Sequence, residues 1–395
     1  MISKMNRLIG AILLVSGTTI GAGMLALPVT TGLAGFLPAV CIMLAIWLYM
    51  ILTAYYLLEV NLRMPGESNL ISMMGKTLGA GGQIVSWIVY LLLLYALMAA
   101  YMMGCSQILN DLIPLSDWVW PLIVFGIFAF FVYFGTSVVD FCNRAMMLGL
   151  IISYVCVIVF GCCHISAPLL THVDWSYLLP SLSVVLTTFG YHIIIPTLTT
   201  YLDHDKRLIK WAIFIGSLIP FVIYFVWQLL VMGVVPLGGE FSLMSANESG
   251  SQITMTLSKL LNSPWMGIAV RIFAFCAIVT SLLGVSLSLH DFLADGLKIK
   301  KGKLGKFFII LLTFFPPLFF TLFYPEGFIA ALSYAGIFVV ILLALLPSAM
   351  AWYERYGKQT QRSFIKSEFR VFGGKPLIII TFIIALCLLG VEIFA

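Results

Sequence analysis

An apolar stretch close to the N-terminus interrupts the helix that its hydrophobicity predicts. Its sequence is Gly17-Thr18-Thr19-Ile20-Gly21-Ala22-Gly23-Met24-Leu25-Ala26-Leu27-Pro28. Glycine loses more backbone entropy in a helix than other residues, and proline lacks the N–H donor that a helix needs. Because lipid offers no hydrogen-bond partner, backbone groups freed in a membrane span must find their partners inside the protein. The stretch therefore predicts a site at a broken helix, whose two ends attract a carboxylate and a cation.

A second apolar stretch repeats this pattern. It reads Thr187-Thr188-Phe189-Gly190-Tyr191-His192 and leads to Pro196. Both stretches start with Thr-Thr-x-Gly and continue through apolar residues to a proline. Paired broken helices in the two halves of a membrane protein are typical of the central site of secondary transporters. Ordinary glycine kinks, which membrane helices tolerate, are the alternative, and the match between the two stretches favours a site.

The composition is that of a polytopic membrane protein. Of the 395 residues, 62% are hydrophobic and only 9% are charged, and the mean hydropathy is +1.10. No soluble domain has enough interior for so many apolar side chains, so a single membrane domain over 1–395 is expected. The eight cysteines are scattered without a CxxC pair, which indicates packing rather than a metal or redox centre.

Apolar runs of about 20 residues predict eleven membrane spans. The expected spans are 8–33, 36–58, 83–110, 118–138, 145–163, 175–202, 211–235, 265–290, 307–324, 328–352 and 376–394. With the N-terminus in the cytoplasm, every lysine and arginine except Lys259 and Arg271 falls on the inner side, as the positive-inside rule requires. The C-terminus is then periplasmic. The basic start resembles a signal peptide, but its apolar run continues through the glycine break, so a retained first helix is expected.

The broken spans are the first and the sixth, and they cross in opposite directions. We therefore expect an all-α membrane protein with a 5+5 inverted repeat over about 8–163 and 175–352, and an additional helix at 376–394. A channel would need a polar-lined pore or a repeated filter, and an enzyme would need clustered catalytic side chains; the sequence shows neither. No cofactor, metal or nucleic acid is expected as a partner.

Motifs along the whole chain carry a family resemblance. They are Gly17 to Met24 with Leu27-Pro28, Leu58-Glu59-Val60-Asn61-Leu62, Phe189-Gly190-Tyr191-His192 with Pro196, Leu283-Gly284-Val285-Ser286-Leu287, Asp291-Phe292-Leu293-Ala294-Asp295, Phe315-Pro316-Pro317 and Tyr334-Ala335-Gly336. They resemble the hydroxy/aromatic amino acid permeases of the amino acid/polyamine/organocation superfamily, most closely the tyrosine- and tryptophan-specific branch. The resemblance implies the inverted-repeat fold, a bacterial inner-membrane location, and import of tyrosine or tryptophan by proton symport. Span three departs from the family's closely spaced tyrosines and small polar residues, which leaves the preferred substrate open.

The expected substrate site combines both breaks with one tyrosine of span three. Its residues are Gly17, Thr18, Thr19, Gly21, Ala22, Gly23, Tyr95, Phe189, Gly190 and Tyr191. We expect the substrate carboxylate at the N–H groups of 21–23, where glycine permits close approach. The ammonium is expected at helix-end carbonyls near Gly17, Thr18 and Phe189. An aromatic substrate side chain needs a mostly apolar pocket, which Tyr95, Phe189 and Tyr191 are expected to line.

Three residues are candidates for ion coupling. His192 is the only histidine deep within an expected span, and histidine titrates near neutral pH. A neutral histidine hydrogen-bonded to a neighbouring helix or to substrate is the alternative. Thr280 and Ser281 are candidates for a sodium site beside the first break. A sodium-coupled symporter, or an exchanger of another neutral amino acid such as serine or threonine, is therefore the alternative function.

Two charged residues are gating candidates. Glu59 ends span two and is expected to pair with Arg63, four residues on, or with the inner end of span one. Arg271 lies inside the outer end of span eight, where it either closes the outer vestibule with an acid such as Glu240 or extends to the surface.

Overall fold

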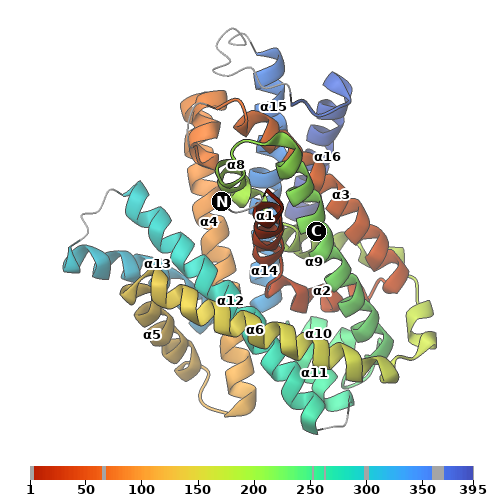
Figure 1. Cartoon of the computed structure of the whole chain (residues 1–395). Coiled ribbons are helices and arrows are strands. Elements are labelled where there is room, and N and C mark those ends of the chain that lie inside the picture. The colour runs from red at the N-terminus through yellow and green to blue at the C-terminus, as the bar shows by residue number, and fades with distance from the viewer. Residues whose placement is uncertain are drawn as a thin grey trace.

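The computed structural model describes residues 4–64, 68–250, 253–261, 264–297, 302–357 and 369–394, and this part of the chain is helical without strands. The helices are α1 (Lys4–Thr19), α2 (Gly23–Gly32), α3 (Phe36–Asn61), α4 (Leu70–Leu112), α5 (Val119–Phe134), α6 (Thr136–Gly161), α7 (Leu182–Thr188), α8 (Ile195–Tyr201), α9 (Lys206–Val234), α10 (Leu243–Glu248), α11 (Ile253–Leu260), α12 (Pro264–Gly296), α13 (Lys303–Phe323), α14 (Phe328–Val339), α15 (Leu346–Tyr356) and α16 (Gly374–Phe394). Figure 1 shows α15 at one end of the molecule and the short helices α10 and α11 at the other.

The helices confirm a polytopic membrane protein but not the exact number of spans. In the described residues, nine helices are long and apolar enough to cross a membrane, and the bent pair α1 and α2 brings the number to ten. The span expected at 118–138 is α5, which is apolar but only 16 residues long. Eleven spans therefore stay a prediction, as do the repeat boundaries 8–163 and 175–352. The orientation of the termini also stays a prediction, and the basic residues in 298–301 and 358–368 lie outside the described residues.

Both expected breaks are confirmed. The first break is residues 20–22, where α1 and α2 meet at an angle of 55°. The second break is residues 189–194, between α7 and α8, and it contains one 3₁₀ turn at His192–Ile194. The glycines weaken the helix at both breaks, and Pro196 lies in the first turn of α8, directly after the second break, whereas Pro28 lies inside α2.

Packing brings the two breaks together. α1 packs along α9, α12 along α6 and α4, and α14 along α4 and α7. α2 contacts α7 and α9, and its side chains Met24, Leu25 and Leu27 are fully buried. Such a helix, apolar on every side, requires neighbours all round. The half-helices of the two broken spans therefore share one core.

Candidate functional site

A cavity of about 580 Å³ lies at the two breaks. This volume is within the range of small-molecule sites. The lining includes these expected site residues: Gly17, Thr18, Thr19, Gly21, Gly23, Gly190, Thr280 and Ser281. The other expected residues do not line it: Ala22, Tyr95, Phe189, Tyr191 and His192. The structure thus brings the backbone of both breaks together but places all three expected aromatic residues, Tyr95, Phe189 and Tyr191, outside the cavity lining.

The first break presents backbone donors to the cavity. The hydroxyl of Ser281 accepts a hydrogen bond from the N–H of Ala22 (3.0 Å) and donates one to the carbonyl of Ala277 (2.9 Å). Within the described residues, the N–H groups of Gly21 and Gly23 donate to no acceptor. Free N–H groups at the start of a helix are suited to an anion such as a carboxylate. Of the three expected donors, the N–H group of Ala22 is occupied by Ser281. The free donors are the N–H groups of Gly21 and Gly23.

Two glycines of the first break are required by close contacts. A Cβ atom added to Gly23 would lie 2.7 Å from the Cγ2 atom of Thr188, at the end of α7. A Cβ atom on Gly21 would collide with the hydroxyl of Ser281. A larger residue at either position would force the two broken spans, or the first break and α12, apart.

Tyr224 of α9 joins the two breaks. It is fully buried, and its hydroxyl donates to the carbonyl of Thr19 (2.7 Å) and lies 3.4 Å from that of Thr188. Both carbonyls belong to helix ends whose own hydrogen bonds stop there. Tyr224 could not be identified from the sequence, because a tyrosine in an apolar span has no local signature of its partner.

We expect Tyr224→Phe to slow substrate uptake about threefold to tenfold. This factor corresponds to the usual net free energy of one hydrogen bond. Tyr154→Phe is the matched control, since the Tyr154 hydroxyl donates to the carbonyl of Ile223 (2.9 Å) on the same helix but away from the cavity. Initial uptake rates, normalised to the amount of protein in the membrane, measure the difference. Equal rates for the two variants would show that the bond between the breaks is dispensable.

Residues of α4 that the sequence did not single out line the cavity. They follow one face of the helix: Tyr90, Leu93, Leu94, Leu97 and Tyr101. Tyr95 lies on another face, and its hydroxyl donates to the carbonyl of Leu312 in α13 (2.8 Å). The phase of a helix decides which residues face a cavity, and this phase can be found only from the packing.

The aromatic residues of the second break pack into the core. Phe189 lies against Tyr224, with 5.5 Å between ring centroids, and Tyr191 lies against His192 at 5.1 Å.

The polar side chain of Asn143, on α6, does line the cavity, and its Oδ1 atom has no hydrogen-bond partner in the described residues. The cavity therefore has a polar group on α6 that the sequence did not indicate.

His192 lies in the second break and contacts α3. Its Nε2 atom is 2.8 Å from the hydroxyl of Thr53, and that hydroxyl also donates to the carbonyl of Met50 (3.2 Å). When the Thr53 hydroxyl donates to Met50, its oxygen accepts from the Nε2–H group, and Nδ1 is then the basic nitrogen of the neutral ring. Nδ1 has no hydrogen-bond partner in the described residues and is buried. This histidine combines a bond to a neighbouring helix with an unused basic nitrogen.

Thr280 and Ser281 lie beside the first break, as expected for a sodium site. The Thr280 hydroxyl donates to carbonyls of its own helix, those of Cys276 (2.9 Å) and Ala277 (3.0 Å). A hydroxyl that donates to a carbonyl keeps a lone pair for another partner. Both residues line the cavity, so their oxygens lie close to whatever occupies it.

A second cavity of about 550 Å³ adjoins the first. The two share three lining residues, Tyr90, Ile193 and Thr197. The second cavity continues to Asn69, at the start of α4, and to Thr200, near the end of α8. Together, the two cavities extend from the breaks toward the end of α4 that lies beside α15.

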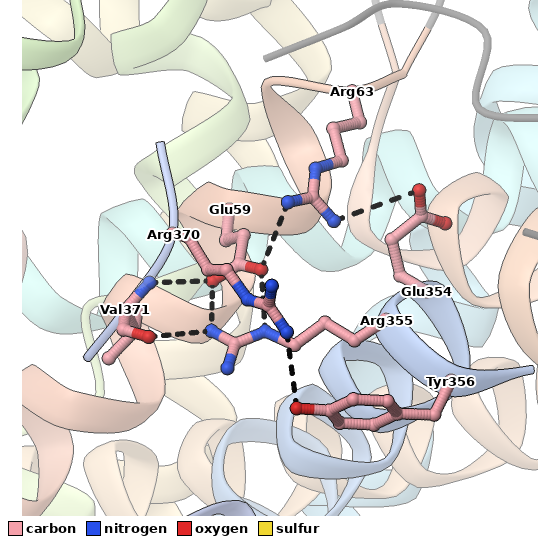
Figure 2. A network of polar contacts seen from close by, with 7 residues as sticks. All are labelled: Glu59, Arg63, Glu354, Arg355, Tyr356, Arg370 and Val371. Atoms are coloured by element: carbon pink, nitrogen blue, oxygen red, sulfur yellow. Dashed lines mark hydrogen bonds and ion pairs between the residues drawn. The ribbon is translucent and has the colours of Figure 1, made fainter. Parts of the chain in front are cut away.

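Glu59 lies in a buried ion-pair network at this end of the molecule (Figure 2). It pairs with Arg63 at 3.2 Å, which confirms that expected pairing. The network also contains a partner that the sequence did not indicate: Arg355 of α15 binds both carboxylate oxygens of Glu59. The backbone of Val371 completes it, since its N–H donates to Glu59 (2.8 Å) and its carbonyl accepts from Arg355 (3.0 Å). Glu59 therefore holds α3, α15 and the segment before α16 together, and its gating role stays a prediction.

Arg271 is exposed on α12. The positive charge of Arg271 attracts the negative charge of the Asp111 carboxylate, near the end of α4. It forms no ion pair with Glu240, although the structure describes both residues. Of the two alternatives for Arg271, extension to the surface agrees with its exposure, and its gating role stays a prediction.

An all-helical membrane protein with a cavity at paired helix breaks is a secondary transporter in its architecture. The chain belongs to the tryptophan/tyrosine permease family, whose sequence profile matches residues 4–392. The family consists of permeases, not enzymes.

Relatives and a solved structure agree with this assignment. The tyrosine-specific transport system 1 of Haemophilus influenzae is 32% identical over 393 residues, which are 98% of this chain and 97% of that protein. A tryptophan-specific transport protein of the same organism is 30% identical, over 95% and 93% of the two chains. The crystal structure of MhsT in complex with L-phenylalanine superposes with a TM-score of 0.66 over 98% of both chains. At 15% identity, this likeness shows the fold alone.

Proposed function

We propose that this protein imports an aromatic amino acid, tyrosine or tryptophan, by proton symport. The main support is the cavity at the two breaks, which combines free N–H groups with a largely apolar lining. The names of the relatives, tyrosine-specific and tryptophan-specific, support the substrate class. The protein is proposed to lie in the bacterial inner membrane, with a cytoplasmic N-terminus and a periplasmic C-terminus.

The substrate's charged groups are proposed to bind the first break. Its carboxylate accepts from the N–H groups of Gly21 and Gly23, and its ammonium donates to carbonyls near Gly17 and Thr18 at the end of α1. Ala22 contributes only when its bond to Ser281 opens. Two free helix ends of opposite polarity fit a zwitterion better than a simple ion.

The aromatic side chain of the substrate is proposed to lie along α4. Tyr90, Tyr101 and the leucines between them provide a mostly apolar surface. Asn143 provides an unpaired amide oxygen on the opposite helix, α6. A polar group on the substrate ring, such as an indole N–H or a phenol, finds an acceptor there.

Proton coupling is proposed to use His192. Its buried Nδ1 atom has no partner, and its bond to Thr53 joins the second break to α3. Protonation at Nδ1 changes the charge inside the second break, at the contact with α3, and such a fold alternates access by rocking one helix bundle against the other.

We expect His192→Gln to lower proton-driven accumulation at least about fivefold while substrate exchange stays within about threefold. Glutamine keeps a donor for Thr53 but does not carry a proton. Thr53→Val is the control, because it removes the hydrogen bond and leaves the imidazole. If Thr53→Val loses accumulation equally, or if His192→Gln keeps wild-type accumulation and pH dependence, His192 is not the proton carrier.

The experiment that tests the proposed mechanism is uptake of labelled tyrosine and tryptophan into proteoliposomes, with proton and sodium gradients imposed separately. Accumulation driven by an inward proton gradient is the expected result. Accumulation driven only by sodium would instead support coupling at Thr280 and Ser281. Exchange of substrate that neither gradient turns into accumulation would contradict symport and leave a facilitator or an exchanger.

A further inference from the structure

An apolar groove lies between α15 and α16, close to the kink of α4 at Gly79. Its volume is about 410 Å³, and its apolar lining comes from three helices: Leu78, Ala349, Trp352, Ile379, Phe382 and Ile383. The hydroxyl of Ser348, which also lines it, donates to the carbonyl of Ala344 in its own helix (2.8 Å). Because both helices belong to membrane spans, the medium that reaches this groove is lipid.

Two cations lie near the groove, at Tyr356 in the last turn of α15. The Lys375 ammonium is 5.0 Å from the ring centre of Tyr356, and the Arg370 guanidinium lies over the same ring and donates to its hydroxyl (3.1 Å). The Tyr356 ring is 5.0 Å from that of Trp352, which lines the groove. Both cations are exposed, and within the described residues neither pairs with a carboxylate.

The position of Arg370 is fixed by the Glu59 network. The next residue, Val371, is hydrogen-bonded through both its N–H and its carbonyl to Glu59 and Arg355 (Figure 2). In the described part of the chain, the Arg370 guanidinium contacts Tyr356 and pairs with no carboxylate. An apolar groove with two exposed cations beside it, neither of them paired with a carboxylate in the described residues, is complementary to an amphiphile with an anionic head.

We propose that this groove binds an anionic phospholipid. One acyl chain lies between α15 and α16, and the phosphate accepts from Arg370 and Lys375. Basic pockets between membrane helices recognise lipid headgroups in this way, and each cation near a membrane surface contributes to affinity. The lipid would support the same helix ends that the Glu59 network joins, on the side of the molecule toward which the second cavity leads.

Native mass spectrometry of the purified full-length protein tests this site. The probes are phosphatidylglycerol, phosphatidylcholine with the same acyl chains, and glycerol 1-phosphate as the headgroup without chains. We expect phosphatidylglycerol to bind about tenfold more tightly than phosphatidylcholine. The double variant Arg370→Gln/Lys375→Gln should lose this preference, whereas Lys306→Gln, an exposed lysine on α13, should keep it. Since all three side chains are exposed, folding is not at risk.

A second variant tests the groove itself. Ala349→Leu fills it and should weaken phosphatidylglycerol binding at least about threefold without changing the charge. The proposal is overturned if the double glutamine variant keeps the preference, if both lipids bind equally, or if Ala349→Leu has no effect. It is also overturned if glycerol 1-phosphate competes as well as the intact lipid, because the site would then bind a free anion.

Discussion

Gly21→Ala should lower the initial rate of substrate uptake roughly tenfold or more, whereas Gly17→Ala should stay close to the wild type. A Cβ atom at residue 21 collides with the Ser281 hydroxyl, which is held by Ala277 and by the N–H of Ala22. The collision moves the free N–H groups that are proposed to bind the carboxylate. At residue 17, the nearest atom to an added Cβ is the Cε of Met147, at 3.9 Å, and no neighbour has to move.

Comparing Gly21→Ala with Gly17→Ala separates two effects. One is a changed geometry of the first break, and the other is the general effect of replacing a glycine of this stretch by alanine. Both glycines line the cavity, so both variants narrow it by one methyl group. The amount of each protein in the membrane is measured beside its uptake. Gly21→Leu places a larger side chain against the Ser281 hydroxyl and should abolish uptake. Wild-type uptake by Gly21→Ala would remove the first break from the substrate site.

Glu59→Gln should destabilise the protein by about 3 to 5 kcal/mol, because it leaves the Arg355 charge buried without its anion. The two side chains are 0% and 1% exposed. Glutamine still accepts from the N–H of Val371, so the effect comes from the charge rather than from the backbone bond. In a thermal denaturation of the purified protein, the expected loss is roughly 5 to 10 °C.

A double variant and an exposed ion pair provide the controls. Glu59→Gln/Arg355→Met removes both charges and should recover most of the loss, since a buried ion pair can often be replaced by neutral residues. Arg144→Gln breaks the exposed pair with Asp140 (2.7 Å) on α6 and should cost less than about 1 kcal/mol. A Glu59→Gln effect as small as that of Arg144→Gln would contradict a structural role for the network.

The sequence was sufficient to predict where the helices break. The Thr-Thr-x-Gly stretches and their prolines predicted the first and second breaks, because glycine and proline act on the backbone locally. The same locality explains the pairing of Glu59 with Arg63, which needs only a helical spacing of four residues. Predictions of this kind depend on neighbouring residues in the chain, and the structure confirmed them.

Interactions between distant segments could not be predicted in this way. The partner of Glu59 that binds both its oxygens is Arg355, and the hydroxyl of Tyr224 reaches Thr19 from another helix. Tyr95 was expected in the cavity because of its residue type, but the phase of α4 turns Tyr90 and Tyr101 toward it instead. Helix phase and long-range pairing are set by packing, which a single sequence does not reveal.

Counterflow in proteoliposomes tests the central claim most directly. The vesicles are loaded with unlabelled tyrosine or tryptophan, and entry of the labelled amino acid is followed without any imposed gradient, so the measurement is independent of the coupling ion. The account predicts that label accumulates transiently when tyrosine or tryptophan is inside, and that loading with serine or glutamine gives no such accumulation. Counterflow with serine or glutamine but not with the aromatic amino acids, or no counterflow at all, would contradict it.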